Sequence, residues 1–203
     1  MMHSSGTIGT LCNIYDKIYT PETSKYYQYI ELANIGNSGE INGVESVLGE
    51  ELPSRARRLV KSGDVVVSSI EGSLESCAII TEEYDKALCS TGFYVIDSDN
   101  YNSETLLVLL KSSAIQSLLK RGCSGTILTN ITKDEFLNIP LPFVDKTIQM
   151  EVKSKIQETY ALRNKSKQLL EYAKQAVEMA IDVNEKGATE WLNSKISELT
   201  RNL

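Results

Sequence analysis

The 203-residue sequence contains one histidine, His3, and four widely spaced cysteines, at positions 12, 77, 89 and 123. No two cysteines have C-x-x-C spacing, which excludes the common zinc-binding patterns. The same spacing favours reduced thiols, buried and inert, in a cytoplasmic protein. No stretch approaches the roughly 20 apolar residues of a membrane span, and the N-terminus has no signal-peptide pattern. We therefore expect a cytoplasmic chain without a membrane segment, metal or cofactor.

The sequence contains only incomplete versions of known catalytic motifs. With a single histidine, the sequence argues against triads that use a histidine base. Ser117-x-x-Lys120 has the S-x-x-K form, but the S-D-N that should follow precedes it and K-T-G is absent. Asn138–Phe143 faintly resembles the target-base loop of amino-methyltransferases, yet its prolines are not adjacent and no glycine-rich cofactor loop precedes it. Asp145 with Glu151 and Lys153 imitates a nuclease metal site, but the last two fall on a predicted helix. The sequence predicts no catalysis.

Net charge and amino-acid composition divide the chain into two parts. Residues 1–145 carry 11 Lys and Arg against 19 Asp and Glu, a net charge of −8. Residues 146–203 carry 10 against 8, a net of +2, and contain no proline. We predict a domain over residues 7–145 and a helical arm over residues 146–203. The net negative charge of this domain argues against nucleic-acid binding, because phosphate contacts supply most of the non-specific affinity for nucleic acids.

Residues 7–145 combine strand, turn and short-helix patterns, which predicts an α+β fold. Short β-rich runs end in Gly, Asn, Ser or Asp clusters, which are typical of turns. Leucines at helical spacing follow them, and later two prolines force extended backbone. The pattern predicts strands near 26–32, 64–70, 78–81 and 92–96, a helix over 103–120, a single helical turn from Thr132, and extended chain over 139–142.

The second part predicts one long helix from Lys146 to about Val183. At about 1.5 Å per residue it would run to roughly 50–55 Å. Its apolar stripe is narrow and needs a partner helix, which favours a coiled-coil arm. A helical hairpin folded back on its own domain is the alternative, since Asn184–Gly187 breaks the pattern and residues 189–203 can form a second helix. The stripe consists of Ile148, Val152, Ile156, Leu162, Leu169, Ala173 and Val177.

Three stretches stand in a characteristic order before the long helix. Ser54–Ile70 contains a basic segment, a Gly-Asp turn and a strand, and Ser90–Ile96 contains Thr-Gly-Phe. Gly125–Pro142 contains a glycine-rich loop, an Asn-Ile step, a short helix and Ile-Pro-x-Pro. This set resembles the target recognition domains of type I restriction-modification specificity (S) subunits, in which a long helix also follows the last proline.

The resemblance implies a non-catalytic subunit that reads double-stranded DNA. It also implies two protein partners, a DNA adenine methyltransferase subunit and an endonuclease/translocase subunit, positioned on a bipartite site. Full subunits carry two such domains and two antiparallel long helices, whereas this chain is similar to a half-subunit or fragment. It could restore the full arrangement as a homodimer through the long helix, and such a pair would read a palindromic site.

Two basic clusters are the strongest candidates for DNA contact. Arg side chains can clamp phosphates or read guanine through two parallel hydrogen bonds. In the second cluster Gly122 and Gly125 let backbone approach a phosphate closely. The alternatives are a solvated basic face for the first and a helix C-cap with connector for the second. The first comprises Arg55, Arg57, Arg58 and Lys61; the second comprises Lys120, Arg121, Ser124, Thr126, Thr129 and Asn130.

Four further residues are weaker candidates. Ser68, Ser69 and Ser73 surround the turn after a strong strand and offer small donors, although surface-turn serines usually only build the turn. Lys25 precedes tyrosines that are more often core. The competing function is a protein-interaction scaffold that docks partners through the long helix. The two basic clusters should lie on one face of the domain if it reads DNA, and on opposite sides if it is a scaffold.

Overall fold

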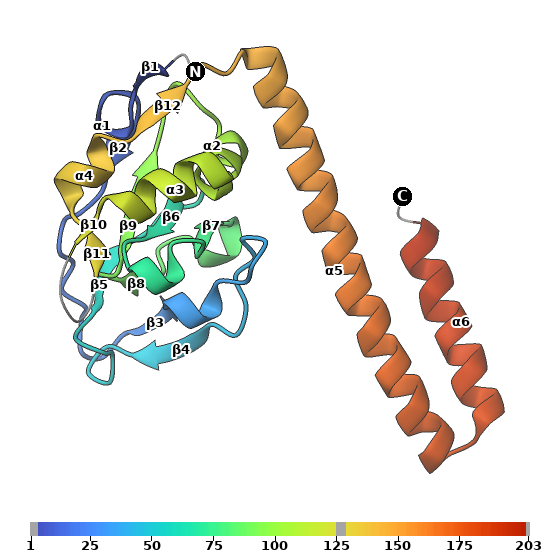
Figure 1. The fold of residues 1–203 in the computed structure, drawn as a ribbon. Coiled ribbons are helices and arrows are strands. Elements are labelled where there is room, and N and C mark those ends of the chain that lie inside the picture. Colours follow the sequence, from blue (N-terminus) through green and yellow to red (C-terminus); the bar gives the residue numbers. More distant parts are fainter. Residues whose placement is uncertain (1–3, 125–128, 202–203) are drawn as a thin grey trace. The chain divides into compact units, whose positions relative to one another are not determined.

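The computed structural model in Figure 1 describes residues 4–124 and 129–201. These residues form two compact units that divide between Lys153 and Ser154. The first unit mixes short strands with short helices, and the second is a pair of helices. The predicted α+β fold is therefore confirmed. None of the helices in the described ranges combines the length and apolar character that a membrane span requires.

The elements follow one another as short segments until the long helix begins. The strands are β1 (Ser4–Thr7), β2 (Asn13–Ile14), β3 (Tyr26–Ile30), β4 (Glu45–Leu48), β5 (Ala56–Leu59), β6 (Val65–Ser68), β7 (Cys77–Ile79), β8 (Leu88–Ser90), β9 (Phe93–Asp97), β10 (Cys123–Ser124), β11 (Asn130–Ile131) and β12 (Pro140–Pro142). The helices are α1 (Ile8–Leu11), α2 (Ser103–Lys111), α3 (Ser113–Arg121), α4 (Lys133–Leu137), α5 (Lys146–Asp182) and α6 (Glu185–Arg201), with short 3-10 turns η1 (Leu32–Asn34), η2 (Glu71–Ser73) and η3 (Glu82–Tyr84).

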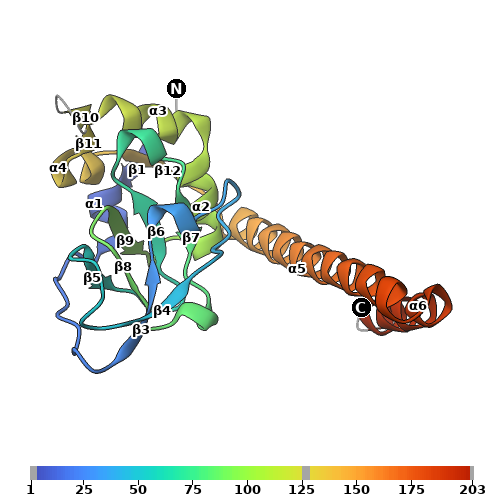
Figure 2. The same cartoon turned by 90° about the horizontal axis from the view of Figure 1, so that it is seen from below.

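Two four-stranded sheets build the first unit. One has the order β2-β9-β6-β7 and is antiparallel throughout. The other has the order β4-β3-β8-β5, in which β3 and β8 run parallel. Figure 2 shows α3 and the second sheet on opposite sides of β6. The predicted strands near residues 26, 64, 78 and 92 correspond to β3, β6, β7 and β9.

The core of the unit joins the two sheets. Val66 and Phe93 of the first sheet pack with Ile30 and Cys89 of the second, and all four are fully buried. Leu106, Leu107 and Leu110 bury one face of α2 against β6 and β7, and three consecutive valines fill β6. The first unit therefore has a substantial hydrophobic core.

The predicted helix over residues 103–120 is wrong in one respect. It is two helices, because Ser112 has extended backbone, with ψ 144°, between α2 and α3. Its hydroxyl accepts a hydrogen bond from the Ile115 N–H and donates one to the Leu109 carbonyl. Serine competes for backbone hydrogen bonds in this way and so favours caps over helix interiors. The break redirects α3 across the unit.

The second unit is the described remainder of α5, together with α6. The predicted break at 184–187 is shorter than expected, because the Asn184 side chain accepts from the Gly187 N–H and begins α6 at Glu185. Tyr172 of α5 and Trp191 of α6 meet edge to face, with ring centroids 5.9 Å apart. Helix α6 therefore packs on one face of α5.

Candidate nucleic-acid interface

Several strand ends from both sheets meet at one edge of the first unit. The Thr91 N–H donates to the Arg55 carbonyl (2.9 Å), and the Ser69 N–H donates to the Gly92 carbonyl (2.8 Å). The Ile131 N–H donates to the Ser69 carbonyl (2.9 Å), and Ile70 forms a β-bridge with Asn130. These steps connect Arg55 to Asn130 across residues that lie far apart in the sequence. We call this the Asn130 edge, with Arg55, Ser69, Ile70, Gly92 and Asn130 as its members.

The second predicted cluster adjoins the Asn130 edge. Helix α3 is capped by Gly122, where an added Cβ would lie 2.9 Å from Ile131 Cδ1, so a larger residue would make the Ile131 side chain shift. Strand β10 then pairs with β11. In Figures 1 and 2, β5, β10 and β11 lie on the same side of the unit. Lys120, Arg121, Ser124 and Asn130 are exposed there and Thr129 is half-buried, while Thr126 lies outside the described residues.

Lys61 lies at the other end of β5. The strand runs antiparallel to β8, and beyond it the Val60 N–H donates to the carbonyl of Ala87, the residue before β8. Six residues of extended chain span about 20 Å, so Lys61 is far from Arg55. The first predicted cluster is thus divided between two edges.

Lys25 shares the edge of Lys61. It precedes β3, which runs parallel to β8, and lines a depression of about 350 Å³ with Leu59 and Lys86. Its Nζ lies 5.5 Å from the ring centroid of Tyr27, within range of a cation–π contact. Two predicted contact residues, Lys25 and Lys61, therefore lie opposite the Asn130 edge.

Arg57 and Arg58 are half-buried within β5. The Arg57 guanidinium donates to the Ala56 carbonyl (3.2 Å). Nε and Nη1 of Arg58 are buried and have no hydrogen-bond partner among the described residues. A buried guanidinium without an acceptor is costly. In this conformation Arg58 points into the domain rather than out to a ligand.

Ser68, the last residue of β6, and the serines that follow it build the turn. Ser68 is fully buried and its hydroxyl bonds that of Ser73 (2.9 Å). The Ser69 hydroxyl donates to the Gly92 carbonyl (2.9 Å). Both hydroxyls are thus satisfied inside the protein, and they hold the Asn130 edge together. Ser73 is half-buried and lines an open groove with Lys120 and Thr129.

Sequence reasoning missed two side chains near this edge. Lys133, at the start of α4, forms an ion pair with Asp16, which lies 117 residues away in the sequence. The hydrogen bond from Lys133 lowers the pKa of the Asp16 carboxyl, and the nearby Arg58 charge lowers it further. The Asn-Ile-Thr-Lys run could have signalled Lys133. Nothing local signals Asp16.

The cysteines offer no reactive centre in this structure. Burial raises the pKa of the Cys77 and Cys89 thiols to about 12, and that of Cys12 to about 11. Such thiols are protonated, and so weakly nucleophilic, at neutral pH. Within the described ranges no three His, Cys, Asp or Glu side chains gather as a metal site.

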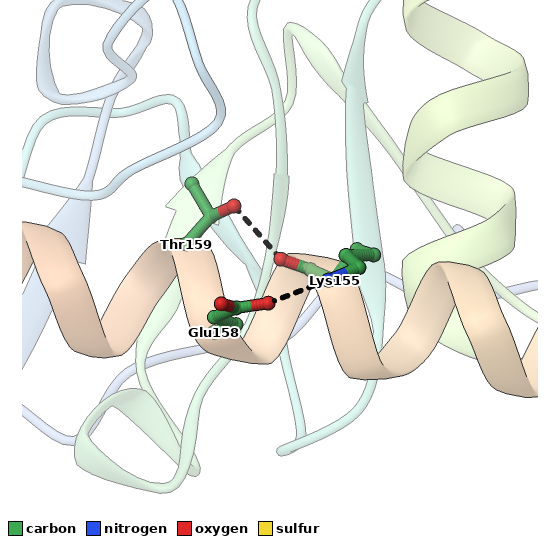
Figure 3. A network of polar contacts seen from close by, with 3 residues as sticks. All are labelled: Lys155, Glu158 and Thr159. Atoms are coloured by element: carbon green, nitrogen blue, oxygen red, sulfur yellow. Dashed lines mark hydrogen bonds and ion pairs between the residues drawn. The ribbon is translucent and has the colours of Figure 1, made fainter.

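The long helix carries the predicted stripe with interruptions. Ile148, Leu162 and Val177 are 52%, 58% and 61% exposed. Lys155 is seven residues from Ile148 and from Leu162, so it lies on their face of α5. Its ammonium pairs with Glu158 (3.0 Å), and its carbonyl accepts from the Thr159 hydroxyl (2.8 Å), as Figure 3 shows. Of the other stripe residues, Ala173 is exposed, whereas Val152, Ile156 and Leu169 are half-buried.

The first unit is a small α+β domain with polar strand ends at one edge, and the long helix α5 follows it in the sequence. Residues 4–172 match the type I restriction modification DNA specificity domain, and the chain belongs to this family. The predicted resemblance to specificity subunits is confirmed.

Solved structures have the same fold. The crystal structure of the HsdS subunit from Thermoanaerobacter tengcongensis is 25% identical, with a TM-score of 0.62 over 86% of this chain and 47% of that one. A structure from work on assembly and conformational transition of the type I R-M system is 25% identical, with a TM-score of 0.65 over 87% and 47%. The type I S subunit from M. genitalium, 16% identical with a TM-score of 0.58 over 86% and 43%, shares the fold. This chain thus spans about half the length of these relatives. A comparison with curated proteins gave no match.

Proposed function

We propose that the chain reads a DNA sequence as the specificity subunit, or half-subunit, of a type I restriction-modification enzyme. In this role it positions a DNA adenine methyltransferase subunit and an endonuclease/translocase subunit on a bipartite site. The observation that carries the proposal is the convergence of Arg55 with Asn130 at one edge, although 75 residues separate them in the sequence. Arg and Asn are the side chains that read guanine and adenine in the major groove.

The proposed DNA contacts are fewer than the sequence suggested. Arg55, Lys120, Arg121, Ser124, Thr129 and Asn130 form the set, with Ser73 at its margin and Lys133 as an addition. The positions of Lys25 and Lys61 argue against a part in the same contact, and so does the burial of Ser68 and Ser69. Arg57 and Arg58 would have to leave their present environment to join it.

The net charge of −8 on residues 1–145 opposes DNA binding by the chain alone. We infer that the methyltransferase subunit supplies further phosphate contacts. Binding by the isolated chain should then be weak and strongly salt-dependent, because each phosphate contact releases counterions. A tight complex with duplex DNA at physiological salt, formed without a partner, would contradict this inference.

The helix α5 is proposed to pair with its counterpart in a second copy of the chain. Its exposed stripe supports this, since Ile148, Leu162 and Val177 leave much of their apolar surface in water. A two-fold pair would place two recognition domains on a palindromic bipartite site. The scaffold alternative needs the same stripe but no DNA contact.

The test is co-purification with the methyltransferase encoded nearby, followed by mapping of the methylated sites. We expect a defined bipartite sequence. Arg55→Ala should weaken duplex binding by the complex about 10-fold and relax one base position. Lys61→Ala removes the same charge at the opposite edge and serves as the matched control, with binding expected within about 2-fold of wild type. Equal effects of the two variants, or no partner at all, would leave the scaffold function instead.

A further inference from the structure

The open groove beside the Asn130 edge has a composition unlike that of a phosphate site. It has a volume of about 840 Å³ and lies between η2, the chain around Gly36, and α3. Its lining includes two carboxylates, Glu71 and Glu75, and one ammonium group, Lys120. The negative charges of Glu71 and Glu75 would repel a phosphate placed in the groove. The groove therefore suits a ligand that donates hydrogen bonds.

Glu71 is held in place at the end of the groove nearest the edge. Its N–H donates to the Thr129 carbonyl (3.0 Å), and the Thr129 hydroxyl donates to its Oε2. The preceding residue, Ile70, bridges Asn130. A carboxylate has about four lone-pair positions, and its other oxygen, Oε1, accepts no bond from the residues that the structure describes. Glu71 thus presents an oriented, half-buried acceptor beside the proposed base-reading residues.

Few groups on a DNA duplex can use such an acceptor. Guanine N7 and O6, thymine O4 and the phosphates are themselves acceptors, so a carboxylate repels them. Adenine offers its N6 amino group, but an acceptor, N7, stands beside it. Cytosine offers its N4 amino group, and its own major-groove edge carries no acceptor.

We propose that Glu71 is a specificity-determining residue whose Oε1 accepts a hydrogen bond from the N4 amino group of a cytosine in the major groove. This inference rests on the proposed function and adds to it the identity of one base that the protein recognises. Thr129 acts as a positioning residue, because its hydroxyl fixes the other carboxylate oxygen. Glu71 is not recognisable as a DNA contact from composition, since a negative charge at a DNA surface is unfavourable unless a base amine engages it.

Glu75 provides a matched control. It has the same charge, lies four residues further along and lines the same groove, but it is exposed. Removing either carboxylate should raise non-specific DNA affinity to a similar degree, because the charge change is equal. Only removal of Glu71 should alter the discrimination between bases.

The experiment uses the complex of the full chain with its methyltransferase subunit, and the duplex sequence found by methylation mapping. Each cytosine in turn is replaced by 2-pyrimidinone, which lacks the exocyclic amine, and dissociation constants are measured. We expect wild type and Glu75→Ala to lose about 10-fold or more in affinity at one position. Glu71→Ala should lose less than about 3-fold there. Glu71→Gln, which keeps a neutral acceptor oxygen, and Thr129→Val should fall between. Thermal unfolding of each variant checks that the loop change leaves the fold intact.

The possible results distinguish failure of this inference from failure of the proposed function. Equal behaviour of the Glu71 and Glu75 variants would overturn it and leave only a charge effect. Loss of coupling at an adenine, tested with a duplex carrying purine in its place, would overturn the assignment to cytosine. A wild-type complex that binds no duplex would reject the proposed function as well.

Discussion

The two compact units differ sharply in how they bury their side chains. Up to Lys153, residues such as Phe93, Leu110 and Phe136 have no exposed surface. From Ser154 onward, Ala176 and Ala188 are the only buried residues among those described, and both are small. The first unit therefore has a core of its own. The second presents helical faces that a further helix can cover.

The largest effect should come from the core of the first unit. Phe136 is fully buried on α4 and stacks on Tyr94, with ring centroids 4.4 Å apart. We expect Phe136→Ala to lower the free energy of unfolding by about 3–5 kcal/mol. Val177→Ala, on the exposed stripe, should change it by less than about 0.5 kcal/mol in the monomer. Urea denaturation at low protein concentration measures both, and similar losses would erase the contrast between the units.

Self-association should depend on the stripe of α5. Leu162→Asp combined with Val177→Asp should raise the dimer dissociation constant about 100-fold, because two charges would enter an apolar seam. Gln168→Asp with Gln175→Asp places the same charges on the opposite face of the helix and is the control. Sedimentation equilibrium distinguishes them. A wild-type chain that stays monomeric at high concentration would refute the proposed pairing.

Lys155 tests whether the polar interruption in the stripe weakens pairing. A single lysine in an apolar seam fixes register at a cost in stability. Lys155→Leu should therefore tighten association about 10-fold, roughly the burial of one leucine. Lys167→Leu, at an exposed position off the stripe, should leave the dissociation constant unchanged in the same sedimentation measurement. Weaker association of Lys155→Leu would mean that the ammonium itself makes a contact across the pair.

The smallest effect concerns the buried guanidinium of β5. Since Nε and Nη1 of Arg58 are buried without a partner in the described residues, Arg58→Met should raise the free energy of unfolding by about 1 kcal/mol. Arg57→Met removes a guanidinium that is hydrogen-bonded to a carbonyl, and should be neutral or slightly destabilising. Chemical denaturation gives both values. A marked loss of stability in Arg58→Met would show that its charge is satisfied in solution.

Strands β3, β6, β7 and β9 and the long helix were predictable because their signals are local. Val65, Val66 and Val67 form a run of β-branched residues, which is typical of a buried strand. The stripe of α5 repeats every three to four residues, as helix geometry requires. The break at Ser112 was missed because a serine can extend or cap a helix, and which it does depends on what the two halves pack against.

The candidate site was predictable only in part. Arg55 and Lys61 are neighbours in sequence, and no local pattern says that a strand places them at opposite edges. Ser68 and Ser69 have the composition of a surface turn, yet both are buried, and their hydroxyls bond Ser73 and the Gly92 carbonyl. The partnership of Asp16 with Lys133 required the chain to fold.

The amino-acid sequence alone determined the α+β pattern, the long helix and the resemblance to specificity subunits, because periodicity, turn residues and motif order are properties of neighbouring residues. Tertiary structure decided which charged and polar side chains share an edge, and which are buried. Those outcomes depend on pairings between distant strands, such as β5 with β8 and Ile70 with Asn130. Only folding brings such distant segments into contact, since each pairing forms when burial of the shared core offsets the entropy of ordering the chain.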